Sequence, residues 1–136
     1  MNQDLTVDEA KAETQTLENG VAGALPDGEV VSSEQKPDGV LLSCSDSTYQ
    51  WTGRTALQLD GSRDRREVLY DVGSAFSEED GFSAALREGS TTPLMVVSGP
   101  EGLSFVADVD DAGLLTVVSA SRCFSLREGE SSSGTY

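Results

Sequence analysis

The sequence contains no histidine, and this absence narrows the chemistry open to the chain. Histidine is the commonest general base, and Ser-His and Cys-His nucleophile pairs cannot form without it. The chain also has no G-x-S-x-G, G-x-G-x-x-G or P-loop pattern. These absences predict a protein that is not an enzyme and holds no cofactor. The alternative is a carboxylate-dependent hydrolase, because a pair of acidic side chains can hydrolyse a glycosidic bond.

Basic residues are scarce: 24 acidic residues outnumber 9 basic ones, giving a formal net charge of −15. A field of this sign repels phosphate, so neither nucleic acid nor an anionic membrane surface is an expected partner. It also disfavours self-association, which predicts a monomer. The remaining partner classes are an envelope protein, which the sequence does not specify, and a small ligand.

The chain has no run of about 18 apolar residues that could cross a bilayer. Its first residues, Met1 to Leu5, lack the charged start and apolar centre of a signal peptide. We therefore expect that an exported form has lost its leader. A membrane attachment would depend on a lipid anchor that this sequence lacks.

The length of 136 residues is typical of one domain. We expect a single α+β domain over residues 1–126. Residues 127–136 are rich in Glu, Gly and Ser, a composition that predicts a disordered C-terminal tail.

Apolar residues at spacings of three and four predict two helices, over residues 6–25 and 63–79. Thr6 and Glu9 have the spacing of a capping box at the start of the first helix. The predicted buried side chains are Ala10, Thr14, Leu17, Val21 and Leu25 on the first helix, and Val68, Leu69, Val72, Ala75 and Phe76 on the second.

Alternating apolar and polar residues between turn signals predict seven strands. They cover residues 29–34, 39–45, 48–59, 82–87, 93–98, 103–109 and 114–126. The turn at residues 36–39 is expected to join the first two strands in a hairpin, and Gly53 is a candidate bulge in the third.

The fold class that follows is α+β, with two helices packed on one face of a mainly antiparallel sheet of about six to seven strands. Each half of the chain runs from a helix through an Asp-Gly pair into strands. This order raises the hypothesis of two αβββ-type halves.

Cys44 and Cys123 are the only cysteines, and with no histidine they cannot complete a zinc site. One interpretation is a disulfide that closes a loop of roughly 80 residues and adds about 4–5 kcal/mol of stability. Such a bond indicates an oxidising compartment outside the cytoplasm. The other interpretation is two reduced, buried thiols. We favour the disulfide, because both cysteines lie in predicted strands that could approach each other.

One acidic segment begins like a calcium-binding EF-hand loop, with Asp108, Asp110 and Gly113 at positions one, three and six. Ala112 and Ser119 occupy positions where that loop requires ligands, and strands are predicted on both sides. We therefore expect a hairpin turn and no metal site.

Two further clusters have both a functional and a structural interpretation. Arg63, Arg65 and Arg66 could dock an acidic partner, but a solvated helix end is the favoured interpretation. Tyr49 and Trp51 could line a ligand groove, but two aromatic residues on the inner face of a strand are more typical of a core.

The order of these features resembles small secreted lipoproteins of actinobacteria. The matching features are a leading helix, Cys44, Trp51, the pair Gly81-Phe82 after the second helix, and Ser-Arg-Cys at 121–123. The resemblance implies that the mature chain follows a lipid-modified cysteine and that the two later cysteines form a disulfide. It implies a location and no activity, and it carries over no catalytic or ligand-binding residue.

These observations predict an exported, non-catalytic binding or interaction domain of the cell envelope. The expected location is extracytoplasmic, either secreted or anchored at the cell surface.

Overall fold

The computed structural model describes residues 5–88 and 92–136. The first four residues, on which the expectation about a leader partly rests, lie outside this part. The described chain forms two α-helices, seven strands and one short 3₁₀ turn. In chain order these are α1 (Val7–Gly23), β1 (Val30–Gln35), β2 (Val40–Ser43), β3 (Tyr49–Leu59), α2 (Arg65–Ser77), β4 (Ser83–Glu88), β5 (Pro93–Ser98), η1 (Pro100–Gly102), β6 (Ser104–Val109) and β7 (Leu114–Ala120).

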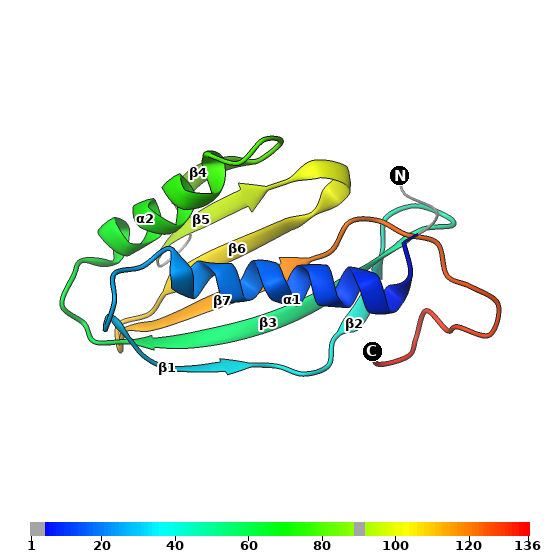
Figure 1. Ribbon diagram of the computed structural model, residues 1–136, viewed down its shortest axis with the longest axis horizontal. Coiled ribbons are helices and arrows are strands. Elements are labelled where there is room, and N and C mark those ends of the chain that lie inside the picture. Colours follow the sequence, from blue (N-terminus) through cyan, green and yellow to red (C-terminus); the bar gives the residue numbers. More distant parts are fainter. Residues whose placement is uncertain (1–4, 89–91) are drawn as a thin grey trace.

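The strands form one antiparallel sheet in the order β1-β3-β7-β6-β5-β4, with β2 also paired to β3. Both helices pack on the same face of this sheet: α1 crosses β3 and β7, and α2 lies over β4 and β5 (Figure 1). The predicted α+β class is confirmed.

Local signals place the helix starts. The Thr6 side chain accepts a hydrogen bond from the Glu9 backbone N–H at 3.1 Å, and Glu9 accepts one from the Thr6 N–H at 3.0 Å, so the capping box is confirmed. Helix α2 begins at Arg65 and not at residue 63, because Asp64 caps it by accepting from the Arg66 N–H.

The prediction that residues 36–39 form a hairpin turn is wrong. Strands β1 and β2 both run antiparallel to β3 and lie end to end along the same edge of it. Residues 36–39 leave the edge of β3 between the two strands. There the Gly39 N–H donates to the Tyr136 backbone oxygen at 2.7 Å, and the Tyr136 N–H donates to the Gly39 oxygen at 3.0 Å. The reversal comes later, where the Cys44 N–H donates to the Thr48 oxygen at 2.9 Å.

Gly53 is not a bulge, because the register between β3 and β7 continues through it without a shift. The irregularity lies in β1, between Val30 and Ser32. Glycine is needed at position 53 for a different reason: a Cβ there would overlap the ring of Trp51. The bulge prediction is therefore wrong, and close side-chain packing is the reason for glycine at this position.

The core consists of two clusters on the helix face. The larger lies under α2 and the end of α1 and includes Val21, Leu57, Leu69, Val72, Phe76, Met95, Val97, Phe105, Leu115 and Val117. The smaller surrounds Trp51 under the start of α1 and includes Leu5, Val7, Ala10, Leu41 and Phe124. Most predicted helix positions are buried as expected. Ala75 is exposed while Gly73 is buried, and Leu17 is half-buried while its neighbour Glu18 is buried.

Residues 127–136 follow a defined path, which differs from the disorder that their composition predicts. The Trp51 indole N–H donates to the Tyr136 oxygen at 2.9 Å, and Thr135 forms a bridge to Val40. Leu126 and Tyr136 also pack against the smaller core cluster. The apolar contacts of Leu126, just before the segment, and of Tyr136, together with the hydrogen bond from Trp51, hold the segment in place. The overall composition of residues 127–136 does not reveal these contacts.

Gly53→Ala is expected to lower the free energy of unfolding by about 1–3 kcal/mol, because the added methyl group must displace the Trp51 ring. The matched control is Gly23→Ala, where a Cβ meets nothing within 4 Å. That change should stabilise the protein by about 0.4–1 kcal/mol. Urea unfolding followed by the fluorescence of Trp51 measures both, and equal effects would contradict the packing argument.

Candidate functional site

Cys44 and Cys123 form a disulfide, with their Cα atoms 6.2 Å apart. Cys44 lies in the loop after β2 and Cys123 lies three residues beyond the end of β7, so the bond joins the β2–β3 hairpin to the segment that leaves the last strand. The predicted pairing is confirmed. A structural disulfide hints at an oxidising environment outside the cytoplasm.

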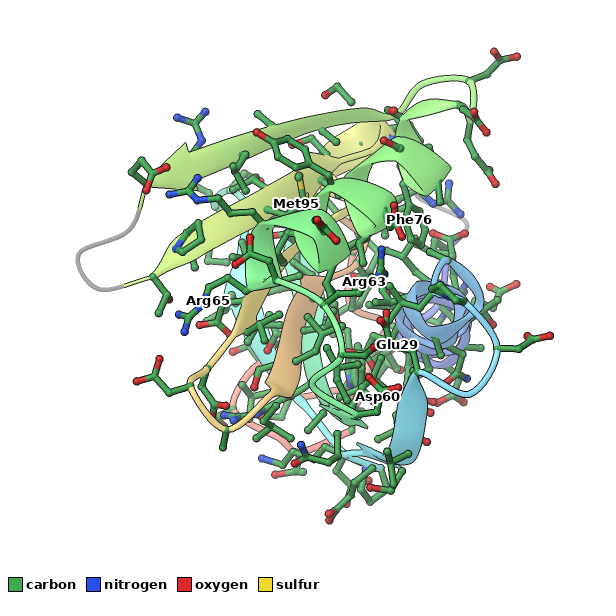
Figure 2. The ribbon with its side chains drawn as sticks, turned by 90° about the vertical axis from the view of Figure 1, so that its left-hand side faces the viewer. Glu29, Asp60, Arg63, Arg65, Phe76 and Met95 are labelled. Carbon is green, nitrogen blue, oxygen red and sulfur yellow. A yellow bond between two sulfur atoms is a disulfide. The ribbon has the colours of Figure 1, made fainter. Side chains whose placement is uncertain are left out.

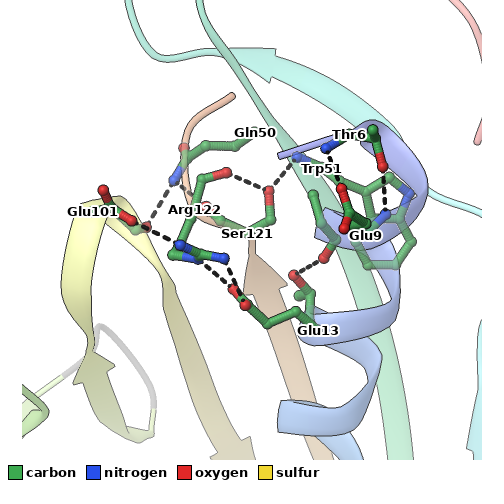
Figure 3. Close-up of polar contacts among 11 residues, drawn as sticks. Thr6, Glu9, Glu13, Gln50, Trp51, Glu101, Ser121 and Arg122 are labelled. Carbon is green, nitrogen blue, oxygen red and sulfur yellow. Dashed lines mark hydrogen bonds and ion pairs between the residues drawn. The ribbon is translucent and has the colours of Figure 1, made fainter. Parts of the chain in front are cut away.

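The residue before the second cysteine, Arg122, is the centre of a polar network (Figure 3). Its guanidinium donates two bonds to Glu13 on α1, at 2.7 and 2.9 Å, and one to Glu101 in the η1 turn, at 2.8 Å. The bonds to Glu13, and then those to Glu101, raise the pKa of Arg122. The bond to Arg122 holds the pKa of Glu101 below its usual range. One guanidinium therefore binds two carboxylates from distant parts of the chain.

The backbone around Arg122 is held by neighbouring strands. Ser121 and Trp51 exchange two bonds: the Trp51 N–H donates to the Ser121 hydroxyl, and the Ser121 N–H donates to the Trp51 oxygen, both at 2.8 Å. The side-chain amide of Gln50 donates to the backbone oxygens of Ser121 at 2.9 Å and of Gly102 at 2.7 Å (Figure 3). Strand β3 thus fixes the segment after β7 and the η1 turn in one arrangement.

The η1 turn adopts a conformation that brings Glu101 to Arg122. Glu101 has a φ of 56°, in the left-handed region that non-glycine residues rarely occupy. Its oxygen accepts the Cys123 N–H at 3.0 Å, which ties the turn to the disulfide. A strained backbone held by several bonds is more common at functional sites than elsewhere.

A groove of about 610 Å³ opens beside this network, between the two helices. Its apolar lining consists of Leu17, Gly20, Phe76, Phe82, Pro100 and Leu103, and its polar lining consists of Glu13, Thr16, Glu79 and Arg122. The volume lies within the range of about 300–1,000 Å³ typical of ligand pockets, as does the pattern of an apolar lining with a few polar groups. The groove is the site in the described chain that best fits a ligand or a partner side chain.

A second polar group lies under α1, sealed from solvent. Glu18 is 1% exposed and accepts hydrogen bonds from the Ser119 hydroxyl at 2.5 Å and the Gln35 amide at 3.0 Å. Among the described residues it forms no ion pair with a cation. Burial raises the pKa of Glu18, although the bonds from Ser119 and Gln35 oppose the shift.

Sequence analysis missed Glu18, although a signal was present. Ala10, Thr14, Glu18 and Val21 continue the three-and-four spacing of the buried stripe, so the stripe itself includes position 18. The apolar Leu17 also fits the spacing, and a hydrophobic pattern favours it over a carboxyl side chain. Arg122 gave no signal, since its partners come from distant parts of the chain.

The three arginines at the start of the second helix are ion-paired. Arg63 binds Glu29 through two bonds of 2.7 Å and also binds Asp71, and Figure 2 shows Arg63 pointing toward Glu29. The other two pairs are Arg65–Asp111 and Arg66–Glu88. These cations stabilise α2 against neighbouring loops, which supports the structural interpretation over a docking site.

Trp51 is fully buried and belongs to the core, as the favoured interpretation predicts, while Tyr49 is half-buried beside it. The acidic segment is the β6–β7 hairpin turn: Asp110 accepts from the N–H groups of Ala112 and Leu114, both at 2.9 Å. The described residues contain no cluster of three potential metal ligands. Neither helix in this part of the chain is long and apolar enough to cross a membrane.

Glu18→Gln is expected to stabilise the protein more as the pH rises. The Glu18 carboxyl in the folded protein has a pKa above its ordinary value of 4.5. The wild-type protein therefore has its full stability below pH 4.5 and loses stability as the pH rises toward the raised pKa. Glutamine stays neutral and can donate to Ser119 while it accepts from Gln35. Urea unfolding at pH 4 and pH 8 measures the difference. A gain that is the same at both pH values would contradict the shifted pKa.

Glu18→Ala serves as the comparison for this experiment. It removes the acceptor for Ser119 and Gln35, so it should cost about 1–3 kcal/mol at pH 4. The cost should be smaller at pH 8, because the variant also removes the carboxyl whose raised pKa lowers the stability of the wild-type protein there. Stabilisation by both variants at pH 4 would mean that the two hydrogen bonds contribute nothing.

Replacing both cysteines with serine is expected to lower the free energy of unfolding by about 4 kcal/mol, because the bond closes a loop with a sequence separation of 79. Urea unfolding of the oxidised protein and of the double variant tests this. In the protein isolated from its natural source, alkylation under denaturing, non-reducing conditions should find no reactive thiol. Two reactive thiols would contradict the inferred oxidising compartment.

Comparison of the chain with protein-family models, with curated proteins and with solved structures finds no match. The function therefore has to be argued from the geometry of the site.

Proposed function

We propose that the chain is a non-catalytic binding domain that acts outside the cytoplasm and holds a ligand or partner side chain in the groove between α1 and α2. The observation that carries this proposal is the groove itself, with its apolar lining and the fixed Glu13–Arg122–Glu101 network at its edge. An apolar site with a few oriented polar groups is the usual form of a small-ligand site.

The groove is held in shape before any ligand arrives. One wall belongs to α1 and α2, whose side chains pack into a single core cluster. The other wall contains Leu103 and Arg122, which lie next to the η1 turn and the disulfide. A site that needs no ordering on binding loses less conformational entropy, and this favours a binding role.

The location is the second part of the proposal. The disulfide supports an oxidising compartment, and with it an exported domain of the cell envelope. Anchoring through a lipid, and an origin among actinobacterial lipoproteins, rest on the sequence resemblance alone. Sequencing the start of the natural gene for a signal sequence that ends in a cysteine would test the anchor.

The competing hypothesis, a carboxylate-dependent hydrolase, has less support. Such an enzyme needs one accessible carboxyl with a raised pKa and a second one nearby. Glu18 has a raised pKa but is sealed under α1, and Glu13 and Glu101 are bound to Arg122. We therefore favour binding over hydrolysis.

A Ser-x-x-Lys spacing also occurs in the chain, at Ser33 and Lys36. Ser33 pairs with Leu57, whose buried side chain lies on the helix face, while Lys36 lines a hollow shared with Val118, which is on the opposite face. The two groups are thus held on different sides of the sheet, whereas a catalytic pair must meet.

Fragment binding followed by NMR tests the groove. Small neutral aromatic fragments should shift the amide signals of Leu17, Gly20, Phe82 and Leu103 together. Leu17→Glu should weaken this binding at least tenfold, because it places a charge in the apolar lining. Ala12→Glu is the matched control, since it adds the same charge at an exposed position of the same helix. Shifts scattered over the surface, or equal effects of the two variants, would contradict the proposal.

A further inference from the structure

The face of the sheet opposite the helices is uncovered. No helix or strand of residues 5–88 and 92–136 packs on it, and Figure 2 shows the sheet with both helices on one side. Directly paired residues of neighbouring strands point to the same side of a sheet. One row of such residues crosses the open face in the order Ala85, Val96, Val106, Val118 and Arg54. We call the three valines with Ala85 the valine row.

The valine row is unusual for a solvent-facing surface. The outer face of an antiparallel sheet normally carries polar side chains. Here Val118 is 51% exposed, and Val96 and Val106 are half-buried. Val40 and Leu42 on β2, which pairs with β3, are 53% and 56% exposed. Contiguous apolar residues on a surface commonly mark an interaction site.

A hollow of about 300 Å³ lies at the Arg54 end of the row. It forms where the edge strand is interrupted at residues 36–39, and its lining includes Lys36, Val40, Thr52, Arg54 and Val118. The hollow therefore combines two cationic side chains with two exposed apolar ones.

The charges on this face are distributed differently from those elsewhere. Among the described residues, the cations with ion pairs include Lys11, Arg63, Arg65, Arg66 and Arg122. Lys36, Arg54 and Arg87 are exposed, and in the described part of the chain none of them has a carboxylate at ion-pair distance.

Unpaired cations are unexpected here, because acidic residues outnumber basic ones by 24 to 9. All three belong to the open face. Arg54 and Lys36 lie at one end of the valine row, and Arg87 lies near the other end, one row away, two residues along β4 from Ala85.

The acidic residues of the same face lie outside the valine row. Glu34 pairs with Ala56, and Asp108 pairs with Thr116, both in the neighbouring row that also contains Arg87. Glu34 lines a second hollow with Lys36 and Arg54, and Asp38 lines the first but forms an ion pair with Lys11 at 3.6 Å. The valine row itself contains no acidic side chain, and the cations Arg54 and Lys36 lie at its β3 end.

We propose that this face is a docking surface for an acidic, apolar segment of a partner protein. Apolar side chains of that segment cover the valine row, and its carboxylates pair with Lys36 and Arg54 at one end and with Arg87 at the other. The row crosses from β4 to β7, and with strands about 4.8 Å apart the distance to Arg54 is about 19 Å. A helix of about 13 residues spans that length.

A partner protein fits this face better than a second copy or a membrane. A second copy carries the same net charge of −15, and an anionic bilayer is an extended negative surface, so the whole field of the protein repels both. A short segment brings only a few carboxylates, which meet the local cations. A local segment that carries both carboxylates and apolar side chains complements the face in both properties. This surface is separate from the groove between the helices, so the proposal does not depend on the proposed function.

The test uses a synthetic amphipathic peptide of 14 residues, with leucines on one face and glutamates beside them. The same peptide with lysine in place of glutamate is the comparison. NMR of the oxidised, isotope-labelled protein should show shifts for the amides of β3, β6 and β7 with the acidic peptide. Lys36→Glu combined with Arg54→Glu should weaken this binding at least tenfold. Arg65→Glu combined with Arg66→Glu changes the charge equally on the helix side and should weaken it less than threefold.

Four results would overturn the proposal: equal binding of the lysine peptide, shifts confined to the groove, an equal loss in both double variants, or no binding at millimolar peptide. Sedimentation of the protein alone over a range of concentrations provides a fifth measurement. A dimer that Lys36→Glu with Arg54→Glu disrupts would assign the face to a second copy and would also overturn it.

Discussion

The bond between Cys44 and Cys123 is the constraint on which the arrangement of the site depends. It joins the segment after β7 to the β2–β3 hairpin, between the hydrogen bonds that Ser121 and Phe124 on either side of Cys123 make to β3. Arg122 is held next to this bond, and through Glu13 and Glu101 it joins α1 to the η1 turn. One covalent link therefore positions three elements that are far apart in the sequence.

The two faces of the sheet differ in how their cations are paired. On the helix side, the acidic side chains outnumber the cation at the groove, and Arg122 is already neutralised by two of them. On the open side, cations lie without acidic partners beside exposed valines, within the described chain. Cations that have no acidic partner within the protein can form favourable electrostatic interactions with an anionic group of another molecule.

The two core clusters differ in what they contribute. The cluster under α2 is apolar and supplies most of the buried hydrophobic surface. The cluster under the start of α1 depends on Trp51, whose ring fills the space above Gly53 and whose N–H is satisfied by Tyr136. Nearby, Glu18 is buried without a cation among the described residues and is held by Ser119 and Gln35. Buried polar groups with few partners give little stability, but they restrict how α1 can sit on the sheet.

The sequence by itself determined the elements, the α+β class and the capping box, because hydrophobic spacing and turn residues are local properties. It favoured a disulfide between the two cysteines but left two reduced thiols open, and the structure shows the bond. It did not determine that β1 and β2 continue along one edge of β3, since turn residues identify a bend and not its angle. Only the tertiary structure brought Glu13, Glu101 and Arg122 together, aligned Val96 with Val118, and left Lys36 and Arg54 unpaired within the described chain. These features depend on strand order and register, which arise from contacts between residues distant in the chain.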